Sequence, residues 1–223
     1  MANHRKKSAA GKKAISKRVS GRPPANKASG RLETILGFAA QAFLNEGFDR
    51  TSVGEIARLA GASKETLYAR FSTKEELFEA VIARKTEILL KRFSRMLTPG
   101  ERIDRVLESY GLSLLNFMLG SEMQRLSRTV VSAAPHFPEL AERFWKLCPD
   151  REQQQLADYL RTESLAGRLT ELNSRKAAEL FFSLCLGQFL LHAQLLVRKP
   201  PTQPERRDHI QEVVRMFLAA YRK

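Results

Sequence analysis

Cysteine and histidine are scarce in this chain, and neither is spaced as in a metal site or an active site. The 223 residues hold two cysteines, Cys148 and Cys185, and four histidines spread from His4 to His209. The sequence also lacks an HExxH pattern, a phosphate-binding loop, a dinucleotide fingerprint and a nucleophile elbow. We therefore expect no enzymatic activity, no metal and no cofactor.

The two cysteines leave three interpretations open. Their number is compatible with a disulfide between them, and a redox sensor is a second interpretation. Cys185 lies in an apolar run, where a thiol usually packs as a small hydrophobic side chain. Reduced, structural cysteines in a cytoplasmic protein are therefore the interpretation that we favour.

Acidic residues are missing from positions 1–30, which hold nine lysines or arginines and most of the net charge of +14. The segment has only Ile15 and Val19 as sizeable apolar residues, too few for a core or an export signal. We expect a disordered basic tail that either aids solubility or binds DNA phosphates. Within it, the tripeptide around Arg22 resembles the short basic element that enters the minor groove beside a DNA-binding domain.

Residues 180–197 form a long apolar run that approaches the length of a membrane span. Ser183, Gln188 and His192 interrupt this run. A helix of a soluble protein that is apolar on all sides is covered both by its own core and by another subunit. We therefore expect a subunit interface here and no membrane segment.

Three helix starts follow one another in residues 52–78, each with a hydroxyl side chain placed to cap the helix. Two of them have the spacing of a capping box. The pairs are Ser52 with Glu55, Ser63 with Thr66, and Thr73 with Glu76. Gly61 stands between the first two helices, where a tight helix–turn–helix corner needs a left-handed residue.

The middle helix is predicted to pack through Leu67 and Phe71 and to turn its polar residues outward. Its hydroxyl, phenol and ammonium groups suit base edges and phosphates, so this helix is a candidate for the DNA major groove. The predicted DNA-contacting residues are Arg22, Thr51, Ser52, Ser63, Lys64, Thr66, Tyr68, Arg70 and Lys74.

These segments together resemble the DNA-binding domain of the TetR/AcrR family of bacterial transcriptional regulators. The resemblance covers residues 30 to about 82 and is carried by residues 52–57, 60–63, 67–68, 71 and 74–78. Arg70 and Ala62 depart from it, since the family often has an aromatic residue or histidine, and a valine, at these places. The resemblance implies that Lys74 meets a DNA phosphate at a helix start. Residues 131–140 are similar to the C-terminal domain of the AefR-like branch.

The remaining periodicity predicts an all-α protein. Proline or glycine ends most segments, and Pro149 should split one long helical pattern in two. Helices are expected over 31–46, 73–97, 102–119, 123–131, 139–166 and 180–197, with a final helix whose apolar stripe runs from 210 to 221. We predict three regions: a tail at 1–30, a helix–turn–helix DNA-binding domain at 31–78, and a helical effector-binding and dimerisation domain at 79–223.

The last two apolar helices of each subunit are predicted to form a four-helix dimer interface, which would place two recognition helices on a palindromic DNA site. Its predicted residues are Leu184, Gly187, Leu191, Leu195, Val214 and Phe217. An effector cavity is predicted among aromatic and sulfur side chains, each of which also suits a simple core. Its candidates are Tyr110, Phe117, Met118, Arg128, Phe137, Trp145, Phe182 and Cys185.

The resemblance implies a dimeric repressor that is released from double-stranded DNA when a hydrophobic small molecule shifts the long fourth helix. The alternative is a DNA-binding regulator or activator that responds to a protein partner rather than to a small ligand. Stabilisation by hydrophobic small molecules would distinguish the two, because only a pocket protein gains stability from them.

Overall fold

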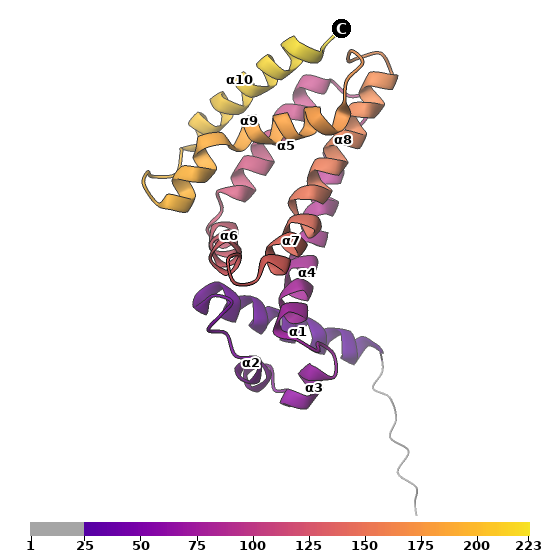
Figure 1. Ribbon diagram of the computed structural model, residues 1–223. Coiled ribbons are helices and arrows are strands. Elements are labelled where there is room, and N and C mark those ends of the chain that lie inside the picture. The colour runs from indigo at the N-terminus through magenta and orange to yellow at the C-terminus, as the bar shows by residue number, and fades with distance from the viewer. Residues whose placement is uncertain (1–24) are drawn as a thin grey trace, which may run out of the picture.

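The computed structural model describes residues 25–223, and ten α-helices account for most of them (Figure 1). The all-α prediction is therefore confirmed for this part of the chain. The helices are α1 (Ala25–Glu46), α2 (Val53–Leu59), α3 (Lys64–Tyr68), α4 (Lys74–Ser94), α5 (Ile103–Met118), α6 (Ser121–Ala133), α7 (Pro138–Leu147), α8 (Pro149–Leu165), α9 (Ser174–Leu195) and α10 (Gln203–Tyr221).

The first helix is longer than predicted, because α1 begins at Ala25 and not at Arg31. Residues 25–30 were assigned to a disordered tail, and that assignment is wrong. Alanine and lysine in this turn favour a helix, and extending an existing helix by one turn costs little. Arg22 and the rest of the predicted tail lie outside the described residues. The predicted end is confirmed: Gly47 has a φ of 81° and donates its N–H to the Phe43 carbonyl at 3.1 Å.

Two hydrophobic clusters organise the molecule, and α4 runs from one into the other (Figure 1). The lower cluster joins α1, α2, α3 and the start of α4, with the rings of Phe43, Phe48 and Phe78 stacked edge to face or in parallel at its centre. It also contains Leu126 and Leu140 from α6 and α7. The lower core therefore does not stop at residue 78, as the predicted domain boundary had it, but draws on the C-terminal half.

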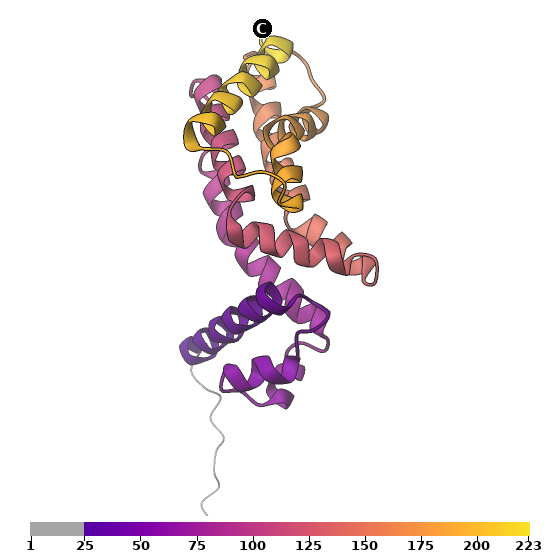
Figure 2. The same cartoon turned by 90° about the vertical axis from the view of Figure 1, so that its left-hand side faces the viewer.

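Helix α6 lies across the long axis of the molecule between the two parts (Figure 2). Its Thr129 hydroxyl donates to the Phe43 carbonyl of α1 at 3.3 Å. Arg143 of α7 forms an ion pair with Glu79 of α4. The N-terminal helices are thus held to the larger domain by side chains from three different helices.

The upper cluster is built by α5, α8, α9 and α10. Gly111 lets α5 approach α9 and α10 closely: a methyl group there would lie 3.1 Å from Ile210 of α10 and 3.2 Å from the Cys185 sulfur of α9. Pro149 separates α7 from α8 as predicted, because its ring can start a helix but not continue one.

Helix α9 bends at Gly187, whose φ of 34° and ψ of −134° are not helical. An added Cβ there would meet no atom of the same chain within 4 Å, so Gly187 does not mark a close approach of helices within the subunit, and its place in a dimer interface stays a prediction. Its role is to turn the chain, which a residue with a side chain does only under strain. By length and mean hydropathy (1.2) α9 would suffice to cross a membrane, although only 22% of that window is buried in the molecule.

The predicted dimer residues divide into two groups. Leu184, Leu191 and Leu195 are exposed on α9, at 39%, 54% and 61%. Val214 and Phe217 of α10 are each only 2% exposed, because they fill the core of their own subunit. Their assignment to a dimer interface is therefore wrong, since the apolar stripe of α10 is covered by α5 and α9 within one chain.

Candidate nucleic-acid interface and ligand cavity

Helices α2 and α3 form the lower end of the molecule, opposite α10 (Figure 1). The corner between them turns at Gly61, whose φ is 61°, and the Ala62 N–H closes it on the Ala57 carbonyl at 2.9 Å. Arg31 of α1 donates to the Gly61 carbonyl at 3.2 Å. The corner is thus fixed from two sides, which sets the angle at which α3 is presented.

The predicted cap of α3 is confirmed. The Ser63 hydroxyl accepts the Thr66 N–H at 3.1 Å and lies 2.9 Å from the Thr66 hydroxyl. The helix is shorter than predicted, because it ends at Tyr68 and does not include Phe71. The N–H groups of Arg70 and Phe71 both bond to the Leu67 carbonyl. A single buried residue, Leu67, anchors this short helix to the module.

The two predicted capping boxes are incomplete. The Ser52 side chain makes no capping bond, and Glu55 pairs instead with Arg58 at 3.4 Å. Thr73 does accept the Glu76 N–H at 3.1 Å, but the Glu76 carboxylate accepts the N–H of Ser72 rather than that of Thr73. The positions of both helix starts were nevertheless correct to within a residue.

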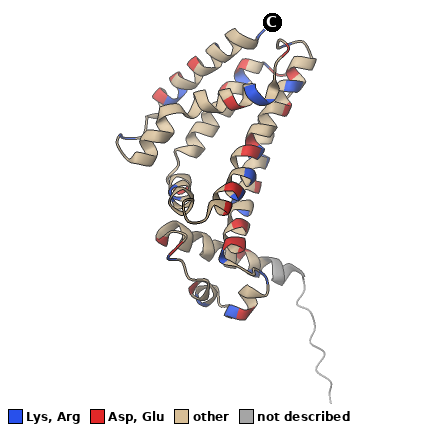
Figure 3. Ribbon diagram, viewed as in Figure 1, with Lys and Arg blue, Asp and Glu red and all other residues tan. Residues whose placement is uncertain are grey.

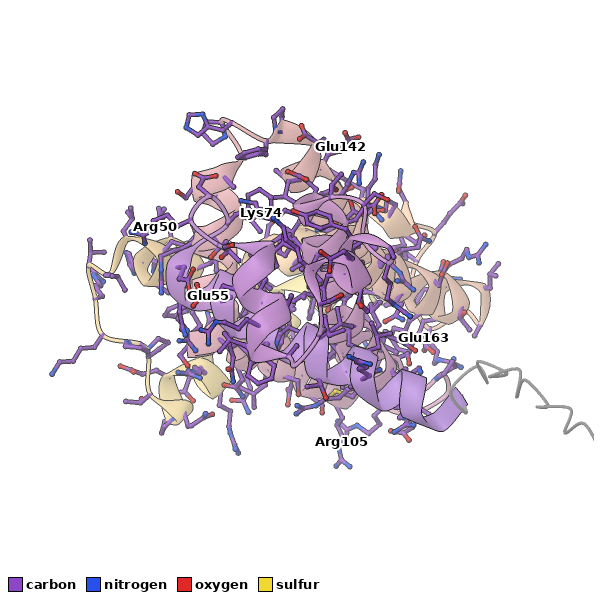
Figure 4. All side chains as sticks on the ribbon, turned by 90° about the horizontal axis from the view of Figure 1, so that it is seen from below. Arg50, Glu55, Lys74, Arg105, Glu142 and Glu163 are labelled. Carbon is purple, nitrogen blue, oxygen red and sulfur yellow. The ribbon has the colours of Figure 1, made fainter. Side chains whose placement is uncertain are left out.

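Five of the predicted DNA-contacting residues are exposed together on or beside α3: Ser63, Lys64, Thr66, Tyr68 and Arg70. Exposed Ser52 precedes α2. The Lys64 ammonium lies 5.7 Å from the centre of the Tyr68 ring, which keeps the two side chains on one side. Seen from this end, the module also presents Arg50, Glu55 and Lys74 (Figure 4).

Glu65 is an exposed acidic residue on α3. Its pKa is lowered by hydrogen bonds to its own backbone N–H and to Ser63 at the start of α3. A carboxylate held in this way accepts hydrogen bonds, as from a cytosine amino group, but repels phosphates. The surface therefore combines donors for DNA phosphates with a carboxylate acceptor.

Two predicted contacts are placed differently. Thr51 is 4% exposed and its hydroxyl donates to the Gly47 carbonyl at 2.7 Å, so its assignment as a DNA contact is wrong for the side chain. The Lys74 ammonium donates to the carbonyls of Phe48 and Asp49 at 2.9 and 3.1 Å and lies over the Phe48 ring. An ammonium has three N–H donors, so the phosphate contact of Lys74 stays a prediction that relies on the third.

A largely apolar cavity of about 260 Å³ lies among α4, α5, α6, α7 and the start of α8. Of the eight predicted effector residues, only Phe117 lines it. The others that line it are Lys85, Thr86, Ile88, Leu89, Arg92, Glu122, Met123, Leu126, Phe144 and Cys148. Lys85 and Glu122 form an ion pair between α4 and α6.

The remaining predicted effector residues have other positions. Tyr110, Phe182 and Cys185 are buried in the closed upper core, and Met118 packs between the two clusters. Phe137 packs edge-on against Phe48 at 5.0 Å, and Trp145 is 50% exposed on the outside of α7. Arg128 is half-buried on α6 and does not line this cavity. These seven assignments to the cavity wall are wrong, because aromatic content alone does not say which helix face meets which.

Sequence reasoning missed Thr86, Leu89 and Cys148. A signal was present in the α4 pattern, where a threonine interrupts an apolar stripe that otherwise reads as core. Both cysteines are free thiols in buried positions, which excludes the disulfide between them. Burial raises the pKa of the Cys148 thiol to about 12, which disfavours the reactive thiolate that a redox sensor needs.

Among residues 25–223, no cluster of three or more histidine, cysteine, aspartate or glutamate side chains could hold a metal ion. Lysine and arginine alternate with aspartate and glutamate along α4 and α7, whereas the free end of α9 is mostly uncharged (Figure 3). The described residues therefore contain three candidate functional features: the polar surface of α3, the cavity beside α4, and the exposed leucines of α9.

Two family models match the chain in the regions described above. The model for bacterial regulatory proteins of the tetR family matches residues 35–81, which cover the second half of α1, α2, α3 and the start of α4. The model for the C-terminal domain of the AefR-like transcriptional repressor matches residues 105–223, more than half of the chain. The chain belongs to the TetR family. Both resemblances predicted from the sequence are confirmed.

The chain is similar to one relative over a short segment, and to solved structures over most of its length. The HTH-type transcriptional regulator QacR of Staphylococcus aureus is 42% identical over 50 residues, which are 22% of this chain. The match spans 27% of QacR, about a quarter of its length. A solved TetR-family regulator from Mesorhizobium loti has a TM-score of 0.80 at 24% identity, over 88% of this chain and 99% of that one.

A second solved structure, the flavonoid-responsive regulator FrrA, has a TM-score of 0.77 and is 28% identical. The likeness covers 87% of this chain and 98% of FrrA. The TetR-family architecture therefore extends over nearly the whole described chain, whereas the closer identity to QacR is confined to a short segment.

Proposed function

We propose that this TetR-family member is a cytoplasmic, dimeric repressor that binds a palindromic DNA site and leaves it when a small apolar effector binds. The observation that carries the DNA-binding part is the joint exposure of Lys64, Thr66, Tyr68 and Arg70 on one fixed helix. These groups donate hydrogen bonds to phosphates and bases, and the helix projects from the end of the molecule.

Dimerisation is supported by the exposed leucines of α9. Leu184, Leu191 and Leu195 form an exposed apolar edge. A soluble protein is stabilised when another surface covers such an edge. A second copy related by a two-fold axis covers the same edge on both subunits. Two recognition helices about 34 Å apart then read two half-sites one helical turn apart.

The effector part is supported by the cavity and by the course of α4. Thr86 and Leu89 of α4 line the cavity, and the same helix starts at Lys74 in the DNA-binding module. A ligand that moves α4 therefore moves α3 relative to its twin. A full reversal between the binding and the released states needs about 5.5 kcal/mol of preference for the released state. The related structure FrrA is named as flavonoid-responsive, which fits a cavity of this apolar kind.

Replacing Tyr68 by alanine tests the DNA-binding part. Tyr68 is 42% exposed and makes no core contact that its removal would disturb, so the variant should fold normally. We expect its affinity for a selected DNA site to fall by about 1–3 kcal/mol, measured by fluorescence anisotropy. Trp145→Ala, which removes a similarly exposed aromatic ring on α7, is the matched control and should bind DNA as the wild type does. Unchanged affinity in Tyr68→Ala would contradict the assignment of α3.

A further inference from the structure

The wall of the cavity beside α4 has a buried, mostly apolar part and an exposed part. Its buried residues, each between 4% and 7% exposed, are Thr86, Leu89, Met123, Leu126 and Cys148. Ile88 and Arg92 of α4 line the same cavity but are exposed, so they mark its mouth. A ligand that fills this cavity therefore places an apolar body inward and keeps its other end near Arg92.

Arg92 brings a positive charge to this mouth. The other cation of the cavity wall, Lys85, already forms an ion pair with Glu122 of α6. Among residues 25–223, no carboxylate forms an ion pair with Arg92, and residues 1–24 contain no aspartate or glutamate. The long stem of an arginine packs along apolar surface while its charged end stays at the edge. The cavity therefore combines an apolar interior with one guanidinium that has no acidic partner in the chain.

We propose that the effector of this cavity is a small apolar carboxylic acid, bound as its carboxylate, and that Arg92 binds the acid group. The inference rests on the proposed function, because it assumes that the cavity holds an effector. A guanidinium presents its N–H groups in a planar fork that matches the two oxygens of a carboxylate. The acid group stays at the mouth, where it keeps part of its hydration.

The charges of the wall disfavour the other two classes of ligand. The wall holds two cations, Lys85 and Arg92, against one acid, Glu122, and that acid is already paired. A cationic effector would lie beside the charge of Arg92 and find no free carboxylate. A neutral effector would gain only the burial of its apolar body and would leave the guanidinium to water.

The volume of the cavity limits the size of the acid. At about 260 Å³ it lies just below the range of about 300–1,000 Å³ that is usual for sites of drug-sized ligands. Two fused aromatic rings, or a short hydrocarbon chain, suit such a space. A long acyl chain would extend beyond it into solvent. We therefore choose probes that carry a naphthalene ring.

Calorimetric binding of three probes to the full chain at pH 7 tests the inference. The probes 2-naphthoate, 2-naphthol and 2-naphthylmethylamine share their fused rings and are anionic, neutral and cationic at this pH. We expect 2-naphthoate to bind at least about fivefold more tightly than 2-naphthol, and the amine to bind more weakly than both. Added salt should weaken only the binding of 2-naphthoate, because it screens the exposed charge of Arg92.

Arg92→Gln separates the charge of Arg92 from its contribution to the cavity wall. We expect this variant to bind 2-naphthoate about fivefold more weakly and 2-naphthol as the wild type does. Arg95→Gln is the matched control, because Arg95 is also exposed at the end of α4 but does not line the cavity. It should bind both probes as the wild type does. Thermal melting checks that both variants are folded.

Three outcomes would overturn the inference: no binding of 2-naphthoate, binding of 2-naphthol as tightly as 2-naphthoate, or an Arg92→Gln variant that binds 2-naphthoate as the wild type does. A loss of both probes in Arg92→Gln would also overturn it, because Arg92 would then support the cavity wall and not the acid group. A DNA titration of the same preparation separates these failures from that of the proposed function. Specific DNA binding together with any of them rejects the acid effector alone, whereas the absence of specific DNA binding rejects the proposed repressor.

Discussion

Lys74 shows at the scale of a residue how one side chain serves both the fold and the candidate DNA surface. Its ammonium holds the carbonyls of Phe48 and Asp49 to the start of α4 and packs over the Phe48 ring. Its removal therefore affects stability, which the sequence alone did not predict. A cation in the first turn works against the helix dipole, and these two carbonyls explain how it is tolerated.

We expect Lys74→Ala to lower the free energy of unfolding by about 1–3 kcal/mol, since it removes two hydrogen bonds to a charged group. Urea unfolding measures this change. Lys64→Ala, at an exposed position of α3, should leave the unfolding midpoint unchanged and weaken only DNA binding. Equal midpoints for Lys74→Ala and Lys64→Ala would contradict the structural role of Lys74.

Glu152 makes a second prediction at this scale, on pH. Its pKa rises from an ordinary 4.5 to about 8 on folding, because burial disfavours the carboxylate. The folded state then binds more protons than the unfolded state between these values, so the stability that Glu152 contributes is fully present below about pH 4.5 and is lost as pH rises towards 8. The loss is up to about 1.4 kcal/mol for each pH unit.

Glu152→Gln should remove this part of the pH dependence, which urea unfolding at pH 5.5 and pH 7.5 measures. The stability of the variant relative to the wild type should therefore be greater at pH 7.5 than at pH 5.5. Tyr110 and Cys148, the titratable neighbours of Glu152, have pKa values raised further by burial and add no slope in this window. A wild type and a variant that lose equal stability between the two pH values would rule out a neutral, buried Glu152.

At the scale of the helix, the kink of α9 depends on one glycine. The φ of 34° at Gly187 is strained for any residue with a side chain. We expect Gly187→Ala to cost about 1–2 kcal/mol of stability by thermal or urea unfolding. Gly37 is the matched control: it lies exposed within α1, and alanine there meets no atom within 4 Å. Gly37→Ala should stabilise the protein by about 0.5–1 kcal/mol. A stabilising Gly187→Ala would show that α9 is straight in solution.

The sequence could predict features that depend on residues close together in the chain, but not those that depend on contacts between distant helices. The Ser63 cap, the Gly61 corner and the break at Pro149 rest on bonds between residues a few positions apart, and the residue types specify them. The burial of Thr51, the carbonyl contacts of Lys74 and the inward position of Val214 depend on which helix lies opposite. An apolar stripe predicts that a helix face is covered, but not whether its own chain or a partner covers it.

The cavity was the least predictable part for the same reason. Its wall combines side chains from five segments, and apart from the threonine that interrupts the apolar stripe of α4, the sequence neighbourhoods of these residues give no sign of it. Trp145 is of a residue type that often lines ligand pockets, but it lies on an outer face of α7. Membership of the TetR family implied a cavity in this domain, yet only the packed helices show which residues line it.

At the scale of the whole molecule, the account requires two copies. The DNA-binding end and the apolar edge of α9 lie in different parts of one chain, connected through α4 and the helices that α4 contacts. A single short α3 reads few base pairs, whereas two copies held by α9 read an inverted repeat. On the proposed function, we therefore expect the leucines of α9 to affect DNA specificity without contacting DNA.

Selection of bound fragments from random duplex DNA by the purified full chain tests this account most directly. We predict enrichment of an inverted repeat whose half-sites lie about one helical turn apart, and loss of that repeat in a Leu191→Glu, Leu195→Glu double variant. Leu165→Glu, at an 84% exposed position at the end of α8, should select the same repeat as the wild type. Enrichment of no sequence, or of a single half-site by a monomeric wild-type chain, would contradict the account.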